Sequence, residues 1–265
     1  MAGLRTTYRK LKKKLKLALS INWFATWYFN LKMFAFSTAI KLPVFFYGKI
    51  RFSNLDGEMI IDAPITKGMI GFGQHFEFPT TSKGTAELFL QGKMVCKGNV
   101  QIGKDVCIKV AESAYFEMGY MACLGSDCRV LCTDKVVLGS NARVGYQTQF
   151  IDTTIHQLID LKTNTKLPMS APIFVNKNNW IGNRTTVMKG AKTPENCITA
   201  SNSLLNKDYT SSKKVIAEYI RNNPDGEEHL CEIIVLIDHS QFLAKFEAEG
   251  KQPTSEYVPI KQCLD

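Results

Sequence analysis

A six-residue unit recurs through the middle of the chain and constrains the fold more than any other feature. It reads IGKDVCI at residues 102–108, LGSDCRV at 124–130, LGSNARV at 138–144 and IGNRTTV at 181–187. Each copy has an aliphatic residue, a glycine, polar and small residues, and a second aliphatic residue six positions after the first. A period of six is neither the 3.6 of an α-helix nor the spacing of a hairpin. Four copies in one register indicate a structural repeat.

The repeat predicts a parallel β-helix. Six residues form one short strand and one sharp turn, and three such units close a triangular coil of about 18 residues. The aliphatic residues fill the axis, and we expect Gly or Asn to supply the positive φ of each corner. The copies start 22, 14 and 43 residues apart, so the coils are irregular. The largest interruption, residues 149–179, is a candidate functional loop.

The local composition of the chain predicts three regions. We expect residues 1–49 to form a basic amphipathic helical arm and an apolar aromatic segment, and residues 50–210 to form the β-helix. Within the β-helix, residues 50–100 alternate strand-forming residues with glycine, as expected of opening coils with an eroded signature. Residues 211–265 form a C-terminal extension, with helices expected over 211–222 and 238–249. A solenoid needs a polar cover on its last coil, and this extension can provide one.

Positive charge is confined to the N-terminal part of the chain. The net charge is +9, yet residues 1–55 hold eleven Lys and Arg and no Asp or Glu, while the other 210 residues hold 22 basic and 24 acidic residues. Residues 4–19 are expected to form a basic amphipathic helix. Its role is left open between peripheral contact with an anionic membrane through residues 1–20 and packing on a neighbouring subunit. Basic residues do not continue into the repeats, so nucleic acid is not an expected partner.

The apolar segments and the cysteines predict the compartment. The longest uncharged apolar stretch, residues 17–31, has 15 residues, fewer than the roughly 20 that a membrane span needs. No signal-peptidase pattern follows it. Eight cysteines fall at uneven spacings without a C-x-x-C motif, which favours small buried side chains in a reducing compartment over disulfides or a zinc site. We therefore expect a cytoplasmic protein, either free or peripherally attached to the cytoplasmic membrane.

Two segments carry a specific resemblance. Residues 180–208, WIGNRTTVMKGAKTPENCITASNSLLNKD, resemble the closing coils of the hexapeptide-repeat acyltransferases, and FIDTTIHQL at 150–158 resembles the catalytic segment of that family. Recognisable pattern covers residues 100–208. The resemblance implies an acetyl-CoA-dependent O-acetyltransferase that modifies a sugar or polysaccharide. It also implies a mainly β fold, a left-handed parallel β-helix, here with an N-terminal helix and a C-terminal helical extension.

The resemblance also implies a mechanism and a set of site residues. His156 matches the family's general base, which takes the proton of an acceptor hydroxyl as that hydroxyl attacks the thioester, and imidazole suits this task at neutral pH. Asp152 is the candidate to orient the ring or the acceptor. By the same resemblance the active unit is a homotrimer with each cleft between two subunits. The implied acetyl-CoA-binding residues are Trp180, Gly182, Asn183, Ala200, Ser201, Asn206 and Lys207, with Lys207 facing the phosphates.

Some residues depart from the family pattern. Pro194 stands in place of Gly, and because proline excludes a positive φ we expect that corner to differ. Asn202 replaces another Gly, a mild change because Asn tolerates a positive φ. Gln157 stands where Pro is frequent. These departures affect the expected donor contacts more than the fold.

Two other functions are compatible with a β-helix. A zinc hydratase needs three converging histidines, whereas the repeat region contains His75 and His156; no metal is therefore expected. His75 either lines the opposite side of the cleft or has a structural role, and His229 and His239 lie outside the repeats. A non-catalytic scaffold is the second alternative, although it leaves His156 and the NKD segment at 206–208 unexplained.

Overall fold

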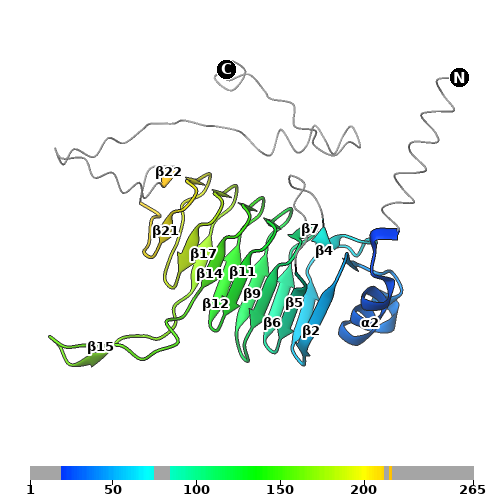
Figure 1. Ribbon diagram of the computed structural model, residues 1–265, viewed down its shortest axis with the longest axis horizontal. Coiled ribbons are helices and arrows are strands. Elements are labelled where there is room, and N and C mark those ends of the chain that lie inside the picture. The colour runs from blue at the N-terminus through cyan, green and yellow to red at the C-terminus, as the bar shows by residue number, and fades with distance from the viewer. Residues whose placement is uncertain (1–18, 75–83, 212–214, 217–265) are drawn as a thin grey trace, which may run out of the picture.

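The computed structural model describes residues 19–74, 84–211 and 215–216, the last two by their backbone alone. The predictions for residues 1–18, 75–83 and 217–265 lie outside this part of the chain; they include the basic helix, His75, His229, His239 and the helix over 238–249. Over the described residues the chain winds as a solenoid of stacked coils, with a short helical segment at its N-terminal end (Figure 1).

Three parallel sheets form the sides of the solenoid, and each strand pairs with the strands one coil before and one coil after it. In order, sheet 1 contains β1 (Val44–Phe46), β4 (Ile70–Gln74), β7 (Val100–Gly103), β10 (Cys123–Leu124), β13 (Arg143–Val144), β18 (Trp180–Ile181), β20 (Ile198–Thr199) and β22 (Val215–Ile216). Sheet 2 contains β2 (Ile50–Leu55), β5 (Ala86–Leu90), β8 (Cys107–Val110), β11 (Arg129–Cys132), β14 (Gln149–Ile151), β19 (Thr186–Met188) and β21 (Leu204–Leu205). Sheet 3 contains β3 (Glu58–Ile61), β6 (Lys93–Cys96), β9 (Tyr115–Met118), β12 (Lys135–Leu138) and β17 (Ile173–Val175). The mainly β parallel helix predicted from the sequence is confirmed.

The axis is filled by alternate side chains of each strand, as the period of two in a strand requires. In β5, Ala86, Leu88 and Leu90 point inward and are buried, while the residues between them are partly exposed. Cysteines contribute to the same core: five of the six in the described residues are buried. Burial raises the pKa of the Cys96 thiol to about 12, so this side chain is neutral and packs as a small hydrophobic group.

The register of the repeats differs from the sequence prediction in one copy. Three copies begin in sheet 1, where Ile102, Leu124 and Ile181 lie on successive strands of one column with Val144 between the last two. The copy at 138–144 begins in sheet 3, because Leu138 pairs with Met118 and Val175. The prediction of four copies in one register is therefore wrong. Each side of the triangle carries the same local pattern, so the pattern marks a side and not a complete coil.

The glycines near one of the corners do not supply its positive φ, in contrast to the expectation. At the sheet 1 to sheet 2 corner the positive φ falls on non-glycine residues, namely Asp105, Asp127, Gln147, Arg184 and Asn202. In four of these five coils a glycine lies two positions earlier, and it allows close stacking: a Cβ on Gly103 would lie 2.6 Å from the backbone N of Ser126 in the next coil. The expectation was therefore correct for Asn and wrong for these glycines.

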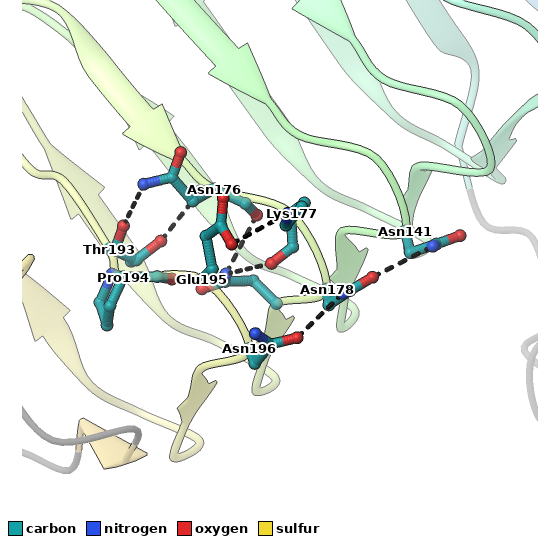
Figure 2. Close-up of polar contacts among 9 residues, drawn as sticks. Asn141, Asn176, Lys177, Asn178, Thr193, Pro194, Glu195 and Asn196 are labelled. Carbon is teal, nitrogen blue, oxygen red and sulfur yellow. Dashed lines mark hydrogen bonds and ion pairs between the residues drawn. The ribbon is translucent and has the colours of Figure 1, made fainter. Parts of the chain in front are cut away.

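The sheet 3 to sheet 1 corner carries a ladder of asparagines (Figure 2). The Asn141 side-chain amide donates to Asn178 at 3.1 Å, and the Asn178 amide donates to Asn196 at 2.9 Å. The positive φ of this coil falls on Asn196, and Pro194 occupies a position without one. The carbonyl of Pro194 accepts a hydrogen bond of 2.8 Å from the buried Asn179. The expectation that Pro194 forces a different corner is therefore wrong.

Both ends of the described solenoid differ from the sequence expectation. At the N-terminal end, β1 joins sheet 1 before residue 50, and the helices α2 (Trp23–Met33) and α3 (Phe36–Ala39) precede it. At the other end, residues 215–216 form β22 on the edge of sheet 1, within the range where a helix was expected. Within the described residues, no helix combines the length and the hydropathy that crossing a membrane requires.

Candidate active site

The candidate catalytic loop leaves sheet 2 after β14 and returns to sheet 3 at β17. Residues 149–151 and 173–175 belong to the sheets, so the loop is narrower than the predicted 149–179. Inside it, β15 (Ile159–Asp160) and β16 (Thr165–Lys166) pair as an antiparallel hairpin. The hairpin extends away from the solenoid (Figure 1).

Backbone pairing closes the root of this loop. Ala171 donates its N–H to the carbonyl of Asp152 at 3.0 Å, and Thr154 donates to the carbonyl of Met169 at 2.9 Å. Between these two contacts, Thr153 and Ser170 form an antiparallel bridge. The segment that carries His156 therefore begins from a paired stem and not from a free loop end.

The Asp152 side chain anchors this stem to the preceding coil. Its carboxylate is fully buried and accepts four hydrogen bonds, all from Thr133 and Asp134. The donors are the two backbone N–H groups and the Thr133 hydroxyl, at 2.8 to 3.0 Å. Burial and the negative charge of Asp152 raise the pKa of the neighbouring Cys132 thiol. The carboxylate thus anchors the base of the loop to Thr133 and Asp134, and these four hydrogen bonds do not involve His156.

His156 lies on the exposed part of the loop, two residues beyond the stem. Its ring Nδ1 is 3.2 Å from the backbone carbonyl of Thr154, and the Thr154 hydroxyl donates back to the carbonyl of His156 at 2.9 Å. A carbonyl oxygen only accepts, so Nδ1 carries the proton in this contact. The lone pair of the neutral ring is then on Nε2.

Two neighbours of His156 shape the loop. Ile155 has φ +62°, a region that β-branched residues rarely occupy, at a cost of about 1–3 kcal/mol. Its N–H donates to the Thr153 hydroxyl at 3.0 Å. On the other side, the Gln157 amide donates to the carbonyls of Leu158 and Leu167 at 3.0 and 2.7 Å. Gln157 thereby joins the two arms of the hairpin, a role that its departure from the family's Pro did not reveal.

Four of the predicted acetyl-CoA-binding residues lie together at the sheet 1 to sheet 2 corner. Gly182 and Asn183 occupy this corner in one coil, and Ala200 and Ser201 occupy it in the next. The two coils are in direct contact: Asn183 donates its N–H to the Ser201 hydroxyl at 3.1 Å, and a Cβ on Gly182 would lie 2.5 Å from the Ser201 backbone N. Gly182 is buried between these coils, whereas Arg184, Ala200 and Ser201 at the same corner are exposed.

The other predicted residues lie apart from this corner. Trp180 begins β18 in sheet 1 and is 55% exposed. Asn206 and Lys207 follow β21 at the sheet 2 to sheet 3 corner, which is also the corner from which the His156 loop leaves. Lys177 and Lys192 form ion pairs with Glu195 and Asp208, whereas the Lys207 ammonium lies 5.5 Å from the centre of the Tyr209 ring. Sheet 2 thus separates Gly182, Asn183, Ala200 and Ser201 at one corner from Asn206, Lys207 and the His156 loop at the other.

Comparisons with known proteins find distant structural likeness alone. No family model matches the chain, and no curated protein matches it. The crystal structure of the polySia-specific acetyltransferase NeuO is similar to 77% of this chain over 88% of its own, with 15% identity and a TM-score of 0.43. The structure of the polysialic acid O-acetyltransferase OatWY is similar to 64% of this chain over 85% of its own, with 15% identity and a TM-score of 0.36. Both likenesses are too distant to transfer an activity or a substrate to this chain.

Proposed function

We propose that the protein is an O-acetyltransferase that moves an acetyl group from acetyl-CoA to a hydroxyl of a sugar or glycan. One observation carries the proposal: His156 is exposed, and the contact of its Nδ1 with the Thr154 carbonyl leaves Nε2 as a proton acceptor. The paired stem beneath the ring and the Asp152 anchor support it, because a general base must be held in position. The positive φ of Ile155 beside it is a further sign of a constrained site.

In the proposed reaction His156 Nε2 accepts the proton of the acceptor hydroxyl while the hydroxyl oxygen attacks the thioester carbonyl. The C–O bond forms, the carbonyl electrons move to oxygen, and their return breaks the C–S bond. His156 then delivers its proton to the departing sulfur, so the ring ends the cycle in its starting form. General-base catalysis of this kind contributes about 10²- to 10⁴-fold.

The residues of the predicted groove fit an extended anionic donor. Ala200 and Ser201 are exposed and carry small side chains, which supports contact of a pantetheine arm with this corner, while Gly182 is buried against the Ser201 backbone. Lys207 is exposed and has no ion-pair partner among the described residues. Its charge is therefore available to the phosphates of coenzyme A. Acetyl-CoA supplies the acyl group, and the chain supplies the surface and the base.

We further propose a homotrimer in which His156 of one subunit faces the donor on another. The separation of the two corners supports it, since one chain places the His156 loop and Gly182 at opposite ends of the sheet 2 strands. The loop also exposes apolar side chains that a neighbour would cover, including Leu161 at 93% and Ile155 at 64%. A cytoplasmic location is part of the same proposal, because acetyl-CoA is the donor.

The decisive test is CoA release from acetyl-CoA with a panel of sugars, nucleotide sugars and glycan oligomers. The variant is His156→Asn, which keeps an amide donor for the Thr154 carbonyl and removes the base. We expect kcat to fall about 10²- to 10⁴-fold with an unchanged thermal unfolding midpoint. The matched control is Lys162→Ala on the exposed hairpin, which we expect to retain wild-type turnover.

Two results would contradict the proposal. Full turnover by His156→Asn would exclude His156 as the base. A failure of the wild-type protein to bind coenzyme A at all would instead favour a non-catalytic scaffold.

Mixing the His156→Asn variant with an Ala200→Trp variant tests the trimer, because mixed assemblies regain some activity only if the two halves of a site come from different subunits.

A further inference from the structure

Helix α2 has an unusual distribution of side chains. Its solvent-facing side carries Trp23, Phe24, Trp27, Tyr28 and Leu31, all exposed. Leu19 before the helix, and Phe36 and Ile40 in and after α3, are exposed as well, and we call these eight side chains together the aromatic face. Phe24 is 84% exposed and Phe36 72%. A surface helix of a soluble protein normally turns such residues toward the core and its polar residues toward water.

The inner side of α2 explains why the helix cannot rotate to hide this face. Ala25, Thr26, Phe29 and Asn30 are buried there. The Thr26 hydroxyl accepts the N–H of Phe46 at 3.1 Å, and the Asn30 amide both donates to the Val44 carbonyl at 2.8 Å and accepts its N–H at 3.2 Å. These side chains satisfy the open edge of β1, the first strand of sheet 1. Edge protection therefore fixes the aromatic face on the outside.

The chemistry of the aromatic face indicates what it contacts. Tryptophan and tyrosine are the side chains enriched at the boundary between membrane and water. Lys32 and Lys41 are exposed beside them, and residues 1–55 contain eleven basic residues and no carboxylate. A second copy that docked through the same face would bring these lysines against each other. An anionic lipid surface offers both an apolar boundary and the opposite charge.

We propose that the aromatic face docks the protein on an anionic membrane surface, with α2 lying in the interface. The helix lies at the N-terminal end of the solenoid, and the β15 hairpin and the last coils lie toward the other end (Figure 1). Docking through α2 therefore leaves the candidate active site open to acceptors at or near the membrane. This inference does not depend on the chemistry at His156.

The chain offers an internal reporter for this contact. It contains three tryptophans, and Trp180→Phe leaves Trp23 and Trp27 as the remaining two. The full-length variant is mixed with vesicles of phosphatidylcholine, with or without phosphatidylserine. We expect a blue shift of the emission and quenching by brominated lipid with the anionic vesicles, both weakened by added salt.

Two matched variants in the Trp180→Phe background distinguish binding through the aromatic face from nonspecific adsorption to vesicles. Phe24→Glu/Leu31→Glu keeps both reporter tryptophans, and we expect it to lower the vesicle partition coefficient at least about tenfold. Leu204→Glu makes the same kind of change on β21, in the last coils, and we expect unchanged binding. Thermal unfolding monitored by circular dichroism checks that both variants fold. Deletion of residues 1–18 from the wild-type chain removes seven basic residues and leaves the aromatic face in place, so we expect it to weaken binding while sparing turnover of a soluble acceptor.

Three outcomes would overturn the proposal. The first is no spectral response to anionic vesicles. The second is protection of Trp23 and Trp27 from acrylamide before vesicles are added, which would mean that another part of the chain or a second copy already covers the face. The third is vesicle binding that the Phe24→Glu/Leu31→Glu change leaves intact but the deletion abolishes, which would assign the contact to the basic arm alone.

Discussion

Replacement of Asp152 separates anchoring of the catalytic loop from catalysis itself. The buried carboxylate accepts four hydrogen bonds from three donors, the N–H groups of Thr133 and Asp134 and the Thr133 hydroxyl. A hydrogen bond to a charged group contributes about 1.5–3 kcal/mol, and an abandoned donor costs about 1–3 kcal/mol. Because Thr133 and Asp134 are partly solvent-accessible, water can satisfy some of these donors. We therefore expect Asp152→Ala to lower the free energy of unfolding by about 3 kcal/mol.

Asp152→Asn refines this expectation. The amide keeps one oxygen acceptor but places an NH₂ group against N–H donors, so we expect roughly half of the loss caused by alanine. Urea unfolding of wild type and both variants measures the differences. Equal protein concentrations are needed, because association shifts the apparent stability. His156→Asn, on the exposed part of the loop, should remain within about 0.5 kcal/mol of wild type.

Activity measured on the folded fraction completes the test. If Asp152 acts by holding the loop, the asparagine variant retains a substantial part of wild-type kcat, and kcat falls further in the alanine variant. The reasoning is refuted if Asp152→Ala unfolds within about 0.5 kcal/mol of wild type. It is also refuted if Asp152→Asn is as inactive as His156→Asn while remaining fully stable, since that result would make the carboxylate a direct participant.

Two further predictions concern the solenoid and its last coil. Gly103→Ala should lower the free energy of unfolding by about 1–3 kcal/mol in urea, because its Cβ would meet the Ser126 backbone. In the control Gly84→Ala the new Cβ has ordinary contacts, so the free energy of unfolding should change by no more than about 1 kcal/mol. Equal losses in both variants would contradict the stacking argument. The hydroxyl and N–H of Thr210, followed by Lys192, lower the pKa of Asp208 from 3.8 to about 2. The stabilisation from this carboxylate is therefore present above about pH 4 and is lost as the pH falls toward 2. Thr210→Ala should raise the midpoint of the Asp208 carboxyl titration in NMR, and an unchanged midpoint would show that the hydroxyl is not responsible.

Much of the fold could be predicted from local pattern. The alternation of aliphatic and polar residues with small corner residues defines a strand and a turn without reference to the rest of the chain, and the parallel sheets confirm this interpretation. Several of the buried cysteines are equally local, because Cys96, Cys123 and Cys132 each follow an apolar residue, whereas Cys128 follows Asp127 and Cys197 follows Asn196. The positions of Leu138 and Pro194 were not predictable in this way. Which corner a repeat occupies depends on the total length of the preceding coils and loops.

The same distinction applies to the candidate site and the N-terminal helix. The motif around His156 and the closing coils identified the loop and its candidate base from the sequence alone. The pattern does not contain the contacts of a side chain with another coil: the Asp152 carboxylate turns to Thr133, 19 residues away, and Asn30 binds Val44 across the end of the sheet. The sequence by itself therefore determined a parallel β-helix with a candidate histidine on its largest loop. The tertiary structure decided how that loop is anchored and which face of α2 remains exposed, because both depend on hydrogen bonds between segments that meet only when the coils stack.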